Sequence, residues 1–391
     1  MTAEQKNVKP RDIFIISNSW NEMGGVARWS HQVASLFAAK GHRVTQVGIV
    51  PAPDGTLDVG PIDQLPYRAV TLHEAHPGPA WWPKKPWDRL NVAAQRKEAG
   101  RQAEIQRAAD QLSAMFRAAK PGAMVIVTQV WAMEWVARAD WAGLPVIGMS
   151  HESFEYSKPS SRFQRVQKWY KDVDRLVLLT QEDADLWIRQ GMNQATSMAN
   201  PMPFMPEVPS PRDQKTVLCV GRLTEQKGLD MLLDAWAEAS QGRPDWTLRL
   251  VGSGEDEEAL RKQCHELGLD SSVDFFGQSQ DVPGQLRRAS IFVQSSRGEG
   301  FPMTLLEAMA TGLPCVAFDC APGVREIVQD EYDGLLATLG NTSELARKLG
   351  RLMDDKELRD LMGDRARKDV QRFAPDTIEA RWEELFALLE R

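Results

Sequence analysis

The residues of this sequence best suited to chemistry are charged side chains that follow apolar runs of strand length. Glu299 and Glu307 lie eight positions apart, the first within the sequence RGEGFP that follows the run SIFVQSS and the second shortly after it. Two glycines and a proline end a strand here and open a helix, whose first backbone amides carry partial positive charge and suit a phosphate. The two carboxylates can accept hydrogen bonds from hydroxyls. The stretch from 297 to 327 therefore predicts a site for a ligand that has both phosphates and hydroxyls.

The same stretch also has an ordinary structural interpretation. Leu305, Leu306 and Met309 form one apolar helix face, and residues 313–318 form the next buried strand. Glutamates in helices are usually solvated. Taken alone, the pair of carboxylates leaves both interpretations open.

Other candidate residues follow predicted strands in the same way. Arg222 and Lys227 lie on the loop after the strand at 216–220, where two cations can neutralise a pyrophosphate. Gly24 and Gly25 lie on the loop after the first strand, and His151 follows the strand at 146–149. Loop charges are usually solvated, a glycine pair often only turns the chain, and a lone histidine is most often structural. A position at the carboxyl end of a parallel strand favours a functional role, because open sheets bind ligands there.

The elements that must position these residues alternate between strand and helix. Predicted strands at 12–17, 42–50, 124–128, 146–149 and 174–179 precede a proline-rich stretch, and the alternation restarts at 216–220. This indicates an α/β chain with an N-terminal domain at 1–200, a linker at 201–213 and a second domain at 214–374. A helix at 375–391 has one apolar face and needs a partner surface, which we expect the first domain to supply. From 51 to 88 the pattern weakens, and we expect an irregular excursion.

Composition and spacing exclude several classes of function. The net charge of −7 argues against nucleic acid as the main partner. The sequence GSGEDE has no third glycine and three acids that would repel a pyrophosphate, which argues against NAD. The Asp-x-Asp triplet at 172–174 precedes an apolar strand and the one at 183–185 lies inside a predicted helix, so we expect no metal site. The four cysteines lack metal spacing and, with no signal peptide or apolar span, indicate a cytoplasmic protein with reduced thiols.

Long strings of the second half carry a family resemblance. VGRLTEQKGLDMLL, LVGSGE, GEGFPMTLLEAMATGLPCVA, GVREI and DGLLA occur in this order and spacing. They closely resemble the retaining glycosyltransferases of family 4 (glycosyl transferases group 1), which have the GT-B fold. The first half is similar only in its Gly-Gly loop and in His151. The resemblance implies two Rossmann-like, doubly wound parallel-sheet domains that face a central cleft.

The resemblance also implies roles for the candidate residues. Arg222 and Lys227 would hold the diphosphate of a nucleotide sugar, Glu307 the ribose hydroxyls, and Glu299 would lie near the transferred sugar. His151 would line the sugar site from the first domain, so that the catalytic residues are His151, Glu299, Arg222 and Lys227. The remaining donor-binding residues would be Gly24, Gly25, Gly300, Phe301, Met303 and Thr304. Neither a metal nor another cofactor is expected, and retention would come from same-face attack.

The donor is expected to be a UDP-sugar, with GDP-mannose as the alternative, and the acceptor a glycan, a cell-surface polymer precursor or a small molecule. A nucleotide-sugar isomerase of similar fold and a non-catalytic nucleotide-sugar-binding partner are competing interpretations. The segment at 76–90 adds a possible contact with the inner membrane surface, through residues typical of lipid interfaces. The same residues could instead pack inward; they are Trp81, Trp82, Lys84, Lys85 and Trp87.

Overall fold

The computed structural model divides the chain into two compact units. It describes residues 9–52, 56, 57, 59–81, 83, 85, 87 and 90–390. Unit 1 comprises Met1–His151, Lys158–Met198 and Glu379–Arg391, and unit 2 comprises Glu152–Ser157 and Ala199–Ile378. Glu152–Ser157 thus belongs to unit 2 although the residues on either side of it belong to unit 1, and Glu379–Arg391 belongs to unit 1 although it follows unit 2 in the sequence. The residues of the predicted linker belong to unit 2.

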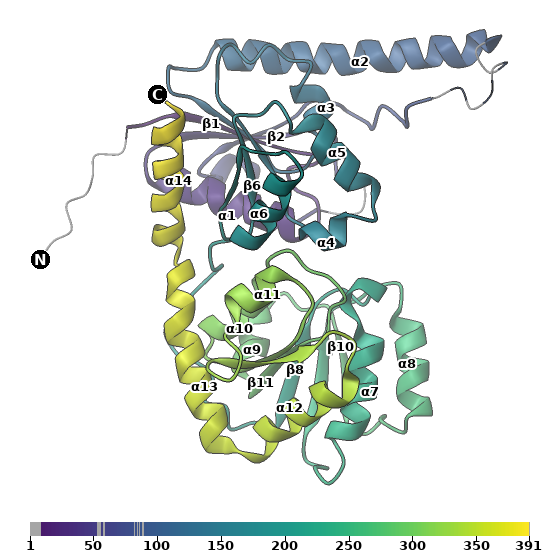
Figure 1. Cartoon of the computed structure of the whole chain (residues 1–391), viewed down its shortest axis with the longest axis vertical. Coiled ribbons are helices and arrows are strands. Elements are labelled where there is room, and N and C mark those ends of the chain that lie inside the picture. The colour runs from purple at the N-terminus through teal and green to yellow at the C-terminus, as the bar shows by residue number, and fades with distance from the viewer. Residues whose placement is uncertain are drawn as a thin grey trace, which may run out of the picture. The chain divides into compact units, whose positions relative to one another are not determined.

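Unit 1 is built on a parallel sheet of seven strands in the order β3-β2-β1-β4-β5-β6-β7 (Figure 1). The strands are β1 (Asp12–Ser17), β2 (Arg43–Gly48), β3 (Arg68–Thr71), β4 (Met124–Val127), β5 (Val146–Met149), β6 (Arg175–Leu178) and β7 (Ala195–Ser197). The helices are α1 (Gly25–Ala39), η1 (Ile62–Gln64), α2 (Val92–Arg117), α3 (Met133–Val136), α5 (Ser161–Trp169) and α6 (Gln181–Arg189).

The burial of the strands explains which of them the sequence revealed. Every residue of β1, β4 and β5 is buried, so these strands are apolar runs in the sequence. The short strands β3 and β7 lie at the two edges of the sheet and contain no buried residue. Because edge strands need fewer apolar residues, their signal is weak. The expectation of irregular structure throughout 51–88 was therefore wrong at β3, which pairs with β2.

The last helix, α14 (Pro375–Leu389), completes the core of unit 1 from Glu379 onward (Figure 1). The ring of Trp382 lies 6.2 Å from that of Trp29 and 6.0 Å from that of Phe37, measured between centroids. Trp382 is only 1% exposed. Glu383 accepts a hydrogen bond of 2.6 Å from Arg11 and contacts His42 at 2.8 Å. The apolar face of the helix thus packs on α1, and charged contacts border it.

Unit 2 is built on a parallel sheet of six strands in the order β10-β9-β8-β11-β12-β13. The strands are β8 (Thr216–Val220), β9 (Thr247–Val251), β10 (Val273–Gly277), β11 (Ile291–Gln294), β12 (Cys315–Asp319) and β13 (Gly334–Thr338). The helices are α4 (Phe154–Ser157), η3 (Glu225–Lys227), α7 (Leu229–Ala239), α8 (Glu257–Glu266), α9 (Val282–Arg287), α10 (Met303–Ala310), α11 (Pro322–Ile327), α12 (Thr342–Asp354), α13 (Lys356–Asp369) and η4 (Val370–Phe373).

The main core of unit 2 lies between its sheet and the helices α7, α8 and α12. Trp236 of α7 is fully buried, and Leu345 and Leu349 of α12 pack into the same cluster. Alternate residues of the central strands, such as Ile291 and Val293 of β11, supply the sheet side of this core. The structure therefore contains two doubly wound parallel sheets, as the sequence predicted.

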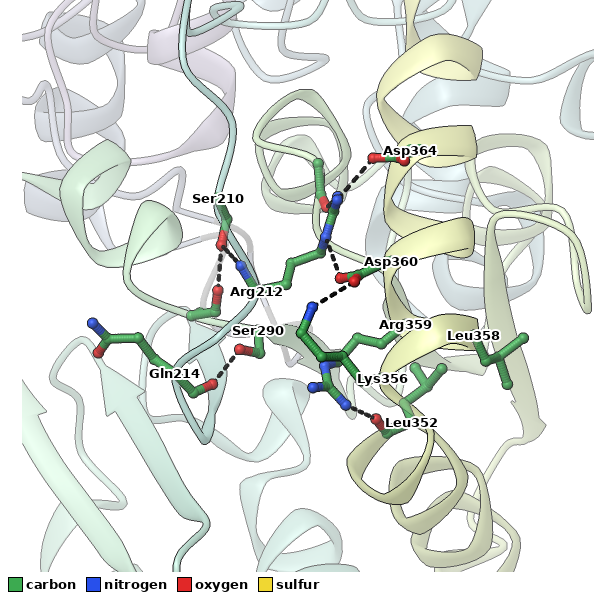
Figure 2. Close-up of polar contacts among 12 residues, drawn as sticks. Ser210, Arg212, Gln214, Ser290, Leu352, Lys356, Leu358, Arg359, Asp360 and Asp364 are labelled. Atoms are coloured by element: carbon green, nitrogen blue, oxygen red, sulfur yellow. Dashed lines mark hydrogen bonds and ion pairs between the residues drawn. The ribbon is translucent and has the colours of Figure 1, made fainter.

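One buried arginine holds the segment that enters unit 2 in place through hydrogen bonds. Arg212 donates hydrogen bonds to Asp360 and Asp364 of α13 and to the carbonyl oxygen of Gly312, at 3.2, 2.8 and 2.7 Å (Figure 2). Ser210 donates to the carbonyl oxygen of Ala289 at 2.6 Å. Gly312 follows the helix α10, so the arginine links the entering chain to the helix that contains Glu307.

Candidate functional site

The candidate residues of unit 2 lie where the strand order of its sheet reverses. Successive strands run outward from β8 in one direction to β10, and from β11 in the other direction to β13. Ligands of open α/β sheets bind at this point, outside the carboxyl ends of the strands. Arg222 follows β8, and Glu299 follows its neighbour β11. The topology thus brings together the two loops that the sequence singled out separately.

Lys227 and Glu299 form the charged centre of this site. The lysine Nζ donates to Oε1 of Glu299 at 2.6 Å, and Oγ of Ser296 donates to the same oxygen at 2.6 Å. The Glu299 side chain is 10% exposed and that of Lys227 is 23% exposed. Charged hydrogen bonds of this length are strong and hold both side chains in one geometry. The ion pair orients an ammonium group beside a carboxylate at a helix N-terminus.

A second set of contacts fixes the loop that carries Lys227. Arg297 donates two hydrogen bonds to the carboxylate of Asp230, at 2.8 and 2.6 Å. The Arg297 guanidinium lowers the pKa of Asp230. Gln226 donates to the carbonyl oxygen of Gly298 at 2.9 Å. Because the two loops are joined on both sides of Lys227, its ammonium group is held without help from a ligand.

Arg222 differs from Lys227 in being exposed. It makes no ion pair with another residue of the described chain. Its guanidinium thus keeps five donors available at the end of β8. A free arginine beside a fixed lysine suits a ligand that brings its own negative charge.

The helix α10 contributes the remaining predicted residues of unit 2. Its N-cap residue is Pro302, and no side chain caps its first amides. Met303 and Thr304 form its first turn and are half-buried. Phe301 is buried, with its ring 5.3 Å from that of Phe373. Gly300 is buried as well, and Glu307 lies in the second turn of the helix and is 1% exposed.

Tyr156 is a residue of this site that the sequence did not indicate. It lies in α4, and its ring covers Gly298 so closely that a Cβ at this position would overlap the ring. Burial raises the pKa of Tyr156, and Glu152 and Glu299 raise it further. The contact explains why 152–157 belong with unit 2. No sequence signal was available, because the two residues are 142 positions apart (298 − 156).

Gly24, Gly25 and His151 lie in unit 1. Gly24 has φ 153°, a conformation that favours glycine. A Cβ atom added to Gly24 or Gly25 would have no other atom within 4 Å, so the space beside both residues is open. Their loop follows β1, the strand at which the order of this sheet reverses. Gln129 holds the beginning of this loop. It accepts a hydrogen bond from the backbone nitrogen of Asn18 at 2.7 Å and donates one to the side chain of Glu22 at 2.7 Å.

His151 follows β5, and its ring makes a T-shaped contact with that of Trp29, with 5.1 Å between ring centroids. Its Nε2 atom is enclosed and has no hydrogen-bond partner among the residues that the structure describes. Burial lowers the pKa of His151 to about 4. The imidazole is therefore neutral at pH 7 and can donate or accept one hydrogen bond through Nε2.

The tryptophan and lysine residues near position 85 are only partly within the described residues. Trp82 and Lys84 lie outside them. Trp81 is half-buried, and its backbone nitrogen donates to Glu98 at 2.9 Å. Trp87 is 64% exposed, and Nζ of Lys85 lies 5.2 Å from its ring centroid. The inward-packing interpretation thus fails for Trp87.

Neither a metal-binding cluster nor a membrane-spanning helix is present among the described residues. No three or more His, Cys, Asp and Glu side chains among them are arranged to hold a metal ion. Among the same residues, none of the helices has the length and apolar character needed to cross a bilayer.

Comparison with known proteins identifies the family. The sequence model of "Glycosyl transferases group 1" matches residues 203–369. An uncharacterized glycosyltransferase of Haemophilus influenzae is 35% identical over 237 residues, which cover 59% of this chain and 67% of the relative. The chain belongs to the glycosyl transferases group 1 family. It is thus an enzyme of the glycosyltransferase class.

Two further similarities extend this assignment. The amylovoran biosynthesis glycosyltransferase AmsD of Erwinia amylovora is 30% identical over 224 residues, which cover 55% of this chain and 63% of that protein. The crystal structure of Anabaena HepE in complex with UDP matches with a TM-score of 0.73 at 20% identity, over 96% of this chain and 99% of HepE. The glycosyltransferase assigned here therefore has the GT-B fold.

Proposed function

We propose that this glycosyltransferase is a retaining, metal-independent enzyme of family 4. It moves a hexose from a nucleoside diphosphate sugar, by preference a UDP-sugar, to a hydroxyl of a glycan or cell-surface polymer precursor. The observation that carries the proposal is the joined pair of loops after β8 and β11, with Lys227 fixed on Glu299 and Arg222 unpaired within the described chain.

The residues of unit 2 supply the charge stabilisation that transfer requires. As the C1–oxygen bond of the donor breaks, negative charge grows on the leaving diphosphate. Arg222, Lys227 and the amides of α10 stabilise that charge, which is the part a divalent cation plays in other transferases. Glu307 accepts hydrogen bonds from the ribose hydroxyls, and Glu299 from the hydroxyls of the transferred sugar.

Retention follows from attack on the same face of the sugar. The acceptor oxygen bonds to C1 as the leaving oxygen departs, and the acceptor proton passes to that phosphate oxygen. This sequence needs no protein nucleophile. His151, a neutral imidazole with an enclosed nitrogen, is proposed as a hydrogen-bonding partner of the transferred sugar.

The relatives support the substrate class. HepE was crystallised with UDP, and AmsD is named for the biosynthesis of amylovoran. A nucleotide-sugar donor and a polysaccharide precursor as acceptor are therefore proposed for this chain also.

We further propose that the segment around Trp87 contacts the inner membrane surface. Trp87 and Leu90 are 64% and 80% exposed, and Lys85 lies beside the tryptophan. Tryptophan with lysine suits the lipid head-group region. Flotation with vesicles of phosphatidylglycerol tests this: the chain should float, and a Lys85→Glu, Trp87→Ala variant should not. Equal flotation of both, or of neither, would remove the membrane contact.

One assay separates transfer from the competing functions. The protein is incubated with UDP-glucose or GDP-mannose alone and then with oligosaccharide acceptors, and the anomeric configuration of the product is read by NMR. An α-linked product from an α-linked donor supports the proposal. A changed sugar without acceptor would indicate an isomerase, and binding without turnover would indicate a non-catalytic partner.

A further inference from the structure

Unit 1 contains a pocket that none of the roles above uses. Its volume is about 350 Å³. It is bordered by α2, α3 and α5 and by Ala80, and its charged lining residues are Arg101, Glu134, Arg138, Arg165 and Lys168. Four cations thus face one carboxylate. The pocket has the charge of an anion-binding site.

The four cations fall into two pairs. Arg101 and Arg138 are fixed: Arg101 donates to the carbonyl oxygen of Gly78 at 3.1 Å and to Glu98 at 3.1 Å, and Arg138 donates to Gln102 at 2.6 Å and to Glu134 at 3.3 Å. Their positions are set by the fold, and their charge is partly neutralised.

Arg165 and Lys168 form the second pair, on the exposed side of α5. Within the part of the chain that the structure describes, neither makes an ion pair. They lie three positions apart, so one helix face presents both cations. Gln164 and Ser161 line the pocket from the same face and add neutral donors. This pair supplies charge that no carboxylate among the described residues compensates.

An aromatic wall accompanies the cations. Trp169 lines the pocket and is half-buried, and Nζ of Lys168 lies 4.3 Å from its ring centroid. A sugar ring packs its C–H groups on an aromatic face, whereas a bare phosphate gains nothing from one. The combination indicates an anionic group attached to a saccharide.

The pocket lies on the side of unit 1 where parallel sheets bind ligands. The C-terminal end of α2 is at the start of the strands, because the backbone nitrogen of Lys120 donates to Asp12 at 2.8 Å. Arg101 precedes Arg117, the last residue of α2, by 16 positions (117 − 101), which is ~24 Å of helix. This brings Arg101 level with the carboxyl ends of the strands. Glu134 and Arg138 come from the connection that follows β4 at that same edge.

We propose that this pocket binds a phosphate or carboxylate substituent of the acceptor saccharide. Arg165 and Lys168 pair with the anion, and Trp169 packs on the sugar that bears it. The acceptor class is then an acidic or phosphorylated glycan rather than a neutral one. That the bound saccharide is the acceptor rests on the proposed function. Binding of the acidic saccharide to the pocket requires neither a donor nor turnover.

Ligand-observed NMR with small probes tests the binding. Glucose 6-phosphate and glucuronic acid should bind the full chain and glucose should not. Arg165→Glu with Lys168→Glu should weaken both acidic sugars at least tenfold. The matched control is Arg107→Glu with Lys171→Glu, which makes the same charge change at exposed positions of unit 1 outside the pocket and should bind like the wild type. Trp169→Ala should weaken the acidic sugars but leave inorganic phosphate unchanged.

Three outcomes would overturn the inference. The first is that glucose binds the wild type as tightly as its acidic relatives do. The second is that the control pair of substitutions weakens binding of the acidic sugars as much as the pocket pair does. The third is that the wild type binds no sugar and the pocket variant no longer floats with phosphatidylglycerol vesicles. The last would make the anion a lipid head group. If the acidic sugars bind as expected but no acceptor is ever glycosylated, the pocket stands and the proposed transfer fails.

Discussion

Glu299 is held by two hydrogen bonds of 2.6 Å, from Lys227 and from Ser296, to a single oxygen atom. One lysine thus has two possible partners: this carboxylate and the phosphate of a donor. A buried ion pair contributes little net stability, since desolvation offsets most of the attraction. The pair is better explained as preorganisation, because a lysine already in position loses less freedom when a diphosphate arrives.

The first prediction concerns the two cations of the loop after β8. Lys227→Ala and Arg222→Ala should each reduce kcat/KM by an amount equal to about 2 to 4 kcal/mol, the loss expected for one preorganised charge-stabilising group. Steady-state kinetics measures it. Lys262→Ala, at a side chain that is 78% exposed, is the control and should be silent. Unchanged turnover in both loop variants would remove the diphosphate assignment.

The second prediction concerns two buried histidines of unit 1. Burial lowers the pKa of His31 and of His151 to about 4, against about 6.5 in an unfolded chain. Above pH 6.5 both states are neutral and the histidines have no effect. As the pH falls from 6.5 towards 4, only the unfolded chain gains protons. The free energy of unfolding should therefore fall by ~1.4 kcal/mol per pH unit for each histidine.

Thermal unfolding at pH 7.5 and pH 5.5 measures this effect. In His151→Gln the drop between the two values should shrink, because this histidine no longer titrates, while His31 and His73, whose pKa values burial also lowers, still contribute. His265→Gln, whose ring is exposed and lies in unit 2, serves as the control. The same drop in wild type and in His151→Gln would show that this histidine is not held neutral.

At the scale of elements, the sequence predicts what is apolar and local. The strands β1, β4 and β5 were found because every residue in them is buried. The helix α6 begins with a local contact, because Thr180 accepts a hydrogen bond from the backbone nitrogen of Asp183 at 3.0 Å. The edge strand β3 was missed, because it lies in the segment where the pattern weakens. Half-exposed elements lack the periodicity that such reasoning uses.

The candidate site shows the same division. Arg222, Lys227 and Glu299 could be named because each follows a strand, and parallel topology brings strand ends together. The hydrogen bond from Lys227 to Glu299 could not be predicted, and neither could the contact of Tyr156 with Gly298. Both depend on the path of loops, which local patterns do not determine. The cationic pocket of unit 1 was missed for a similar reason, because its residues come from three helices and a loop.

The third prediction concerns the docking of α14 on α1. Trp382 is fully enclosed between aromatic rings, so Trp382→Ala should cost ~3 to 5 kcal/mol of the stability of unit 1, the usual cost of such a core truncation. Leu388→Ala changes a residue of the same helix that is 46% exposed and should cost less than about 0.5 kcal/mol. Urea unfolding followed by circular dichroism gives both values. Equal effects would mean that the helix does not stabilise unit 1.

At the scale of the whole molecule, the two units divide the chemistry. Unit 2 contains the strand order, the fixed lysine and the uncapped helix that suit a nucleoside diphosphate, and the family match covers this half. Unit 1 contains His151 and the cationic pocket. Under the proposed function, such a division allows one donor site to be combined with different acceptors, because changes in unit 1 would leave the proposed diphosphate contacts of unit 2 intact.

The last prediction is that transfer needs no divalent cation. The diphosphate of a leaving nucleotide must be neutralised, and a transferase does this with a metal ion or with fixed cations and helix amides. Here Arg222, Lys227 and the N-terminus of α10 provide two full charges and a helix dipole. Initial rates should be the same within about twofold with excess EDTA and with added Mg²⁺ or Mn²⁺. In Lys227→Ala, by contrast, added Mg²⁺ should restore part of the lost rate, since the cation can take over the missing charge. Loss of wild-type activity with EDTA, recovered on adding metal, would show that the fixed cations are not sufficient and that the site recruits an ion.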